Sequence, residues 1–119
     1  MGSETRDRKG DLGMVRISHE VIGRIAAIAA REVPGVAGVK EGVWPGSGLP
    51  WLAGVRVKTH ERELHVAVPI VVEYGVNLPR AAIQVQQRVR EAVGRMTDID
   101  LVEVEVSIAG VRELKEGRP

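Results

Sequence analysis

The chain has 119 residues, of which 44% are hydrophobic and 28% are charged, and its formal net charge is +1. This size and composition are those of one globular domain with a buried core, and the near-neutral charge excludes a global attraction to nucleic acid or anionic lipid. The absence of cysteine excludes disulfides, thiolate zinc sites and cysteine nucleophiles.

Residues 1–12 are polar and charged and lack the apolar stretch of a signal peptide, so we expect them to form a disordered tail. The longest uncharged apolar runs, at residues 25–30 and 66–72, are far shorter than a membrane span. The sequence therefore predicts a cytoplasmic protein without direct membrane insertion, whose contact with a membrane would come through a partner.

A short strand is expected at residues 14–17, followed by a helix over residues 19–32. Ser18 suits the N-cap because its side chain can accept a backbone hydrogen bond, and the pair Pro34-Gly35 ends the helix. The buried stripe is expected to contain the apolar residues at helical spacing: Val21, Ile22, Ile25, Ile28 and Ala29.

The middle of the chain predicts a β-hairpin, with strands over residues 53–59 and 64–72 and a turn at residues 61–62. If the turn has two central residues, Thr59 faces Leu64, and with this register the apolar side chains of both strands share one face. Glu61-Arg62 is poor chemistry for a primed turn, so a longer loop is the alternative.

The other face of this hairpin is expected to be polar. Pro69 lacks an N–H group, so we expect it where pairing with the first hairpin strand stops. The polar side chains on this face are Arg56, Lys58, His60, Glu63 and His65.

A second helix is expected over residues 79–96, with Asn77 as its N-cap and Gly75 in the turn before it. A last strand should run over residues 101–109 and stop at Gly110. The buried stripe of the helix is expected to contain Ala82, Val85, Val89, Ala92, Val93 and Met96.

The predicted order is β-α-β-β-α-β, which is an α+β fold. Two helices would pack on one face of a mainly antiparallel sheet, in a two-layer, ferredoxin-like sandwich. A single domain would span residues 13–111, between the disordered tail of residues 1–12 and a charged tail of residues 112–119.

Several segments resemble the alkaline-shock-protein family, also called envelope stress response proteins, over residues 14–111. The matching segments are MVRISHEVI at residues 14–22, PGVAG at 34–38, VVEYGVNLP at 71–79, TDI at 97–99 and VEV at 102–104. The resemblance implies a small, non-enzymatic cytoplasmic protein of Gram-positive-type bacteria, linked to cell-envelope homeostasis. It also implies self-association and a small membrane-anchored protein as partner.

Three histidines occur, and two of them, His60 and His65, would share the polar face of the hairpin with Glu63. Two imidazoles and a carboxylate can bind one transition-metal ion. No recognised ligand spacing is present, so we favour a solvated polar face and expect no metal or other cofactor.

Glu73 and Tyr74 stand at a strand end beside a glycine, where functional residues often occur. A buried Glu73 could act as a base, but the sequence shows no nucleophile or oxyanion donor to accompany it. We therefore expect no catalytic residue. The structural alternative is that Tyr74 covers the edge of the core and Glu73 binds loop N–H groups.

The second helix carries four arginines, Arg80, Arg88, Arg90 and Arg95. An RNA-binding module that uses this basic face is the alternative function. The nearly neutral chain lacks the strand aromatics on which bases stack, so we do not expect it to bind nucleic acid.

Both tryptophans, Trp44 and Trp51, belong to a segment rich in Pro and Gly, which we expect to be a loop. Rigid aromatic side chains on a constrained loop are effective docking anchors; the alternative is that they cover the open end of the core. The preferred function is self-association and partner docking without catalysis. The candidate interaction residues are Trp44, Trp51, Glu73, Tyr74, Asn77, Arg80 and Arg88.

Overall fold

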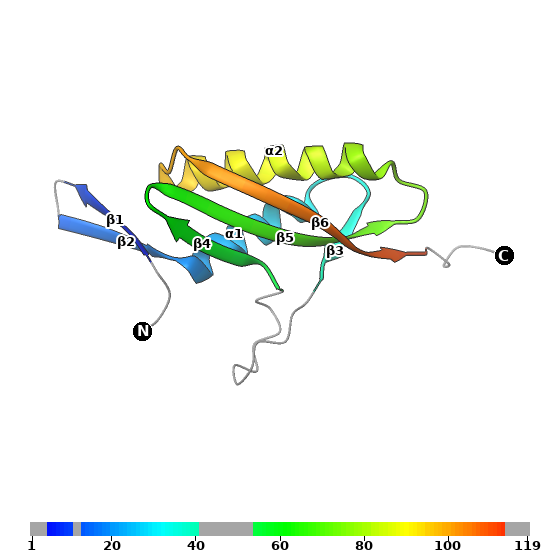
Figure 1. The fold of residues 1–119 in the computed structure, drawn as a ribbon, viewed down its shortest axis with the longest axis horizontal. Coiled ribbons are helices and arrows are strands. Elements are labelled where there is room, and N and C mark those ends of the chain that lie inside the picture. Colours follow the sequence, from blue (N-terminus) through cyan, green and yellow to red (C-terminus); the bar gives the residue numbers. More distant parts are fainter. Residues whose placement is uncertain (1–4, 11–12, 41–53, 114–119) are drawn as a thin grey trace, which may run out of the picture.

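The computed structural model describes residues 5–10, 13–40 and 54–113. Its elements are β1 (Thr5–Gly10), β2 (Gly13–Ser18), α1 (His19–Arg31), β3 (Val36–Val39), β4 (Arg56–His60), β5 (Glu63–Glu73), α2 (Leu78–Thr97) and β6 (Val102–Arg112). The helix α2 runs along β6 while α1 lies behind β4 and β5 (Figure 1). The α+β class and the predicted order are confirmed, with β1 and β3 as additional strands.

The strand β5 is the centre of the main sheet. On one side it pairs with β6, which runs parallel because the chain crosses over through α2 between the two strands. On the other side two antiparallel strands share its length, with β4 along residues 63–67 and β3 along residues 70–72. The predicted hairpin register is confirmed, since Thr59 pairs with Leu64.

The strand β2 does not join the main sheet but forms a separate two-stranded sheet with β1. We expected a disordered tail where β1 lies. The pairing is a hairpin, from Gly10 opposite Gly13 to Thr5 opposite Ser18, and Figure 1 shows that it projects at one end of the molecule. Closing so short a loop costs little chain entropy, which favours this local partner.

Pro69 lies at the point where the neighbour of β5 changes. The pairing with β4 ends at Ala67, and the pairing with β3 begins at Ile70. The carbonyl of Pro69 accepts a hydrogen bond from the N–H group of Lys40 at 2.8 Å. The nitrogen of a strand residue faces the same side as its carbonyl, so the missing N–H group falls at this junction, as a proline in a sheet requires.

The helix α1 buries its small residues, and our prediction of its buried stripe was wrong at two positions. Val21 and Ile28 are 49% and 46% exposed. Alanine side chains let this helix approach α2 and the sheet more closely than a β-branched face would. The buried positions of α1 are Ile22, Ala26, Ala27, Ala29 and Ala30.

The helix α2 buries Val85, Val89 and Val93 as predicted, but Met96 is 65% exposed. Thr97 is buried in its place. Its hydroxyl donates to the carbonyl of Val93 at 2.6 Å and accepts from the N–H group of Ile99 at 3.2 Å. These two bonds satisfy the buried hydroxyl where the helix ends.

Candidate functional site

The segment after β5 is held by the end of β6. A guanidinium nitrogen of Arg112 lies 3.0 Å from a carboxylate oxygen of Glu73, and the N–H group of Tyr74 donates to the carbonyl of Arg112 at 2.9 Å. The ring of Tyr74 is 79% exposed. The expectation that Tyr74 covers the core edge was therefore wrong, and the described partner of the Glu73 carboxylate is Arg112 rather than loop N–H groups.

Asn77 is the N-cap of α2, as predicted. Its side-chain oxygen accepts a hydrogen bond from the N–H group of Arg80 at 2.9 Å. This bond satisfies one of the N–H groups that a helix leaves unpaired in its first turn. The role seen for Asn77 is thus structural, while the Arg80 side chain is exposed beside it.

The four arginines of α2 do not all lie on one face. Arg88 makes an ion pair with Glu32 at the end of α1. Arg90 donates from Nε to the carbonyl of Val102 in β6 at 3.3 Å. Two of the four arginines therefore make contacts within the chain, on opposite sides of the helix, which weakens the support for an RNA-binding face.

Two side chains of α2 cover the outer edge of β6, the edge that faces away from β5. Arg90 donates to the carbonyl of Val102, and Gln86 donates to the carbonyl of Val104 at 3.1 Å. Carbonyls of alternate strand residues point to the same edge, so these bonds satisfy successive acceptors of that edge. The first half of β6 is therefore protected from pairing with another strand.

The second half of this edge has no such cover from α2 among the described residues. The side chains of Ile108 and Val111 are 37% and 57% exposed. Ile83, 52% exposed, lies one helical turn before Gln86 on the same stripe of α2. We call these three side chains, together with the outer edge of residues 106–112, the β6 edge surface.

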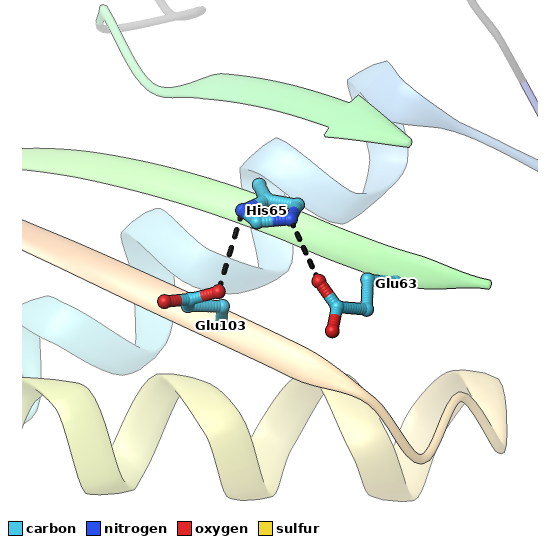
Figure 2. A group of neighbouring side chains, drawn as sticks. All are labelled: Glu63, His65 and Glu103. Carbon is cyan, nitrogen blue, oxygen red and sulfur yellow. Dashed lines mark hydrogen bonds and ion pairs between the residues drawn. The ribbon is translucent and has the colours of Figure 1, made fainter. Parts of the chain in front are cut away.

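A second feature lies on the face of the sheet opposite the helices. Figure 2 shows His65 of β5 between two carboxylates, Glu63 on its own strand and Glu103 on β6. Its Nε2 atom is 3.0 Å from a Glu63 oxygen, and its Nδ1 atom is 3.6 Å from a Glu103 oxygen. One ligand atom from each residue lies within 4.8 Å of the others. We call these three residues the histidine–carboxylate cluster.

The histidine–carboxylate cluster differs from the three possible metal ligands predicted from the sequence, which were His60, Glu63 and His65. Glu63 and His65 are in it, whereas His60 is outside it and pairs across the hairpin with Glu63. Glu103 was missed because it reaches His65 only through the parallel register of β6 against β5. Its alternation with buried valines did predict that it faces outward, but not which strand it would stand beside.

Trp44 and Trp51 lie outside the described residues. The docking and core-covering alternatives for them both remain predictions. Within the described part of the chain, neither helix combines the length and the apolar character that crossing a bilayer requires.

Residues 7–113 match the alkaline shock protein 23 family, which is described by a cell envelope-related function. The chain is similar to YqhY of Bacillus subtilis (strain 168), with 34% identity over 85% of this chain and 78% of that protein. It is also similar to a stress response regulator gls24 homolog of Streptococcus pyogenes serotype M1, with 28% identity over 84% of this chain. The match spans 59% of that regulator's length.

Among solved structures, the chain is similar to a variant of the MamM CTD. The TM-score is 0.50 and the sequence identity is 18%, over 82% of this chain and 100% of that one. At this identity the likeness concerns the fold alone.

Proposed function

The chain belongs to the alkaline shock protein 23 family, and from that premise we propose that it is a non-catalytic protein of envelope homeostasis and stress response. It works by self-association and by docking to a partner protein in the cytoplasm. The family's envelope-related description and the stress-regulator relative support the first part of this proposal. The β6 edge surface is the observation that supports the second part.

The occupant of the β6 edge surface is a second copy of the chain. A strand edge with unpaired N–H and C=O groups is a template for another strand, and natural proteins cover such edges or pair them. In the described chain α2 covers only the half near Val102 and Val104. The uncovered half carries exposed apolar side chains, which would leave water on pairing.

Charge complementarity favours an antiparallel pair related by a two-fold axis. Glu105 and Arg112 stand near opposite ends of the uncovered half, opposite Ala67 and Glu73 of β5, and therefore on the same face of the sheet. Antiparallel pairing brings Glu105 of one copy near Arg112 of the other, twice in each dimer, where the guanidinium that already pairs with Glu73 would be shared by a second carboxylate.

The first experiment compares oligomeric state by analytical ultracentrifugation over a wide range of concentration. Wild-type protein is expected to dimerise. The double variant Ile108→Asp/Val111→Asp should be monomeric and folded, with a lowered melting temperature, because Val111 is 57% exposed but Ile108 only 37%. Ile28→Asp, an exposed apolar position on α1, is the matched control and should still dimerise. A monomeric wild type, or a dimeric double variant, contradicts this assignment.

The second experiment asks what the chain docks to. The full-length protein is used as bait for detergent-solubilised membranes and, separately, for the membrane-free extract. We expect enrichment of a small membrane-anchored protein from the first, with no RNA in either. Salt-sensitive capture of RNA alone would instead favour the nucleic-acid alternative.

A further inference from the structure

We propose that the histidine–carboxylate cluster, completed by His60, binds a divalent transition-metal ion on the outer face of the sheet. Glu63 and His65 Nε2 are the first two ligands, and His60 is the third. Glu103 accepts the Nδ1–H group of His65 and fixes the ring. The inference does not depend on the proposed function.

The backbone brings these groups together on three adjacent strands. Glu63 and His65 are two residues apart on β5 and so share a face. Glu103 stands opposite His65 on β6, and His60 stands opposite Glu63 on β4. Directly opposed residues of an antiparallel pair have Cβ atoms about 5 Å apart, which is within reach for an imidazole and a carboxylate on one ion.

The atomic spacing suits coordination. Ligands at about 2.0–2.2 Å from a zinc ion in a tetrahedral arrangement lie about 3–4 Å from one another. The 3.0 Å between His65 Nε2 and the Glu63 oxygen is a hydrogen bond in this structure. A metal ion would replace the shared proton and hold the two atoms a few tenths of an ångström further apart. His60 lies outside the group of neighbouring ligand atoms in this structure, so binding requires its exposed side chain to rotate about the Cα–Cβ bond and bring the ring to the same ion.

Glu103 has the role that carboxylates play behind metal-bound histidines. A ligating imidazole commonly donates its second N–H group to a carboxylate, which selects the tautomer and aims the free nitrogen at the metal. Figure 2 shows this relation, with the Nδ1 side of the ring turned toward Glu103 and the Nε2 side toward Glu63. A shift of a few tenths of an ångström closes the 3.6 Å separation of Nδ1 and the Glu103 oxygen to a hydrogen bond.

The types of ligand atom determine which metal ion the site prefers. Two imidazoles and one carboxylate favour Zn²⁺, Co²⁺ or Ni²⁺ over Mg²⁺ and Ca²⁺, which prefer oxygen ligands alone. Lys58 stands opposite His65 on β4, and its positive charge opposes a cation. We therefore expect weaker binding than at a buried structural zinc site.

The test is calorimetric titration of the full chain, without a histidine tag, with ZnCl₂ and with MgCl₂. We expect one Zn²⁺ per chain and no response to Mg²⁺. Cobalt titration should give the visible absorption bands of a tetrahedral Co²⁺ site. Zinc should also raise the melting temperature, since an ion that binds only the folded chain stabilises it.

Variants separate the site from nonspecific binding. His65→Ala should abolish zinc binding, His60→Ala should weaken it, and Glu103→Gln should weaken it about 10- to 100-fold, as loss of an orienting carboxylate does elsewhere. Glu105→Gln, two residues along the same face of β6, is the matched control and should bind as wild type does.

Melting in the presence of EDTA checks that each variant is folded. If wild-type protein gives no heat and no cobalt bands, the proposal is wrong. If folded His65→Ala binds zinc as wild type does, the ion is adventitious only and the proposal is equally wrong.

Discussion

Gly35 and Gly75 both have positive φ angles, 90° and 100°, which side chains disfavour. Their surroundings differ. A Cβ atom at Gly35 would lie 2.9 Å from Cγ2 of Val76, whereas one at Gly75 would meet no atom within 4 Å. Gly38 in β3 has neither constraint. Comparing these three positions therefore distinguishes the energetic cost of backbone strain from that of steric overlap at single residues.

We predict a graded loss of stability when each of these glycines is changed to alanine. Gly38→Ala should change the unfolding free energy by less than about 0.5 kcal/mol. Gly75→Ala should lower it by about 1–2 kcal/mol through backbone strain alone, and Gly35→Ala should lower it further, by an overpacking cost of about 1 kcal/mol or more. Urea denaturation measures all three. Equal losses at Gly35 and Gly75 would mean that Val76 moves aside without cost.

At the scale of elements, burial contributes more than charge to holding α2 in place. The ion pair between Arg88 and Glu32 joins two side chains that are about half exposed, 51% and 50%. Such pairs contribute from about 0 to 1 kcal/mol. A fully buried valine such as Val89 contributes about 1.5–3 kcal/mol by leaving water, so the apolar stripe of α2 outweighs the ion pair.

Val89→Asp should therefore abolish the soluble folded protein. The new carboxylate would be buried between helix and sheet, where an unpaired charge costs several kcal/mol. Met96→Asp, at an exposed position of the same helix, is the control and should cost less than about 1 kcal/mol. Circular dichroism and thermal melting of both variants make the comparison. A Val89→Asp protein with the wild-type melting temperature would show that this face is not part of the core in solution.

At the scale of the whole molecule, both proposed binding sites lie outside the core that is packed between the helices and the sheet. The β6 edge surface and the histidine–carboxylate cluster both use β6, the former along its edge and the latter on its outer face. Two different events, pairing of copies and metal binding, can thus be tested separately by substitutions on one strand. Ile108→Asp/Val111→Asp should leave zinc binding unchanged, because neither residue belongs to the cluster.

The last prediction concerns Trp44 and Trp51, whose segment lies outside the described residues. If these side chains dock a partner, Trp44→Ala and Trp51→Ala keep the wild-type melting temperature and lose partner capture in the pull-down. Truncating a tryptophan that packs on the core would instead cost about 3–5 kcal/mol. Variants that melt normally and still retain every partner would exclude docking through these side chains.

Short-range chemistry let the sequence alone determine the helix caps and the hairpin register. Ser18 accepts from the N–H group of Val21 and Asn77 from that of Arg80, three residues away in each case. Thr59 faces Leu64 because a two-residue turn and a period-2 apolar pattern agree. The family segments at residues 14–22 and 71–79 contain these same caps, so the resemblance and the local physics point to one fold.

Contacts between distant segments were decided only by the tertiary structure. Val21 and Ile28 fit the helical period as well as the buried alanines of α1 do. They are nevertheless exposed, because the face with small side chains packs more closely against the rest of the chain. Glu103 reached His65 because β6 aligned parallel to β5 in one particular register. The period of a strand predicts which face a residue occupies but not which strand lies beside it. The β6 edge surface and the histidine–carboxylate cluster could therefore be identified only from the assembled sheet.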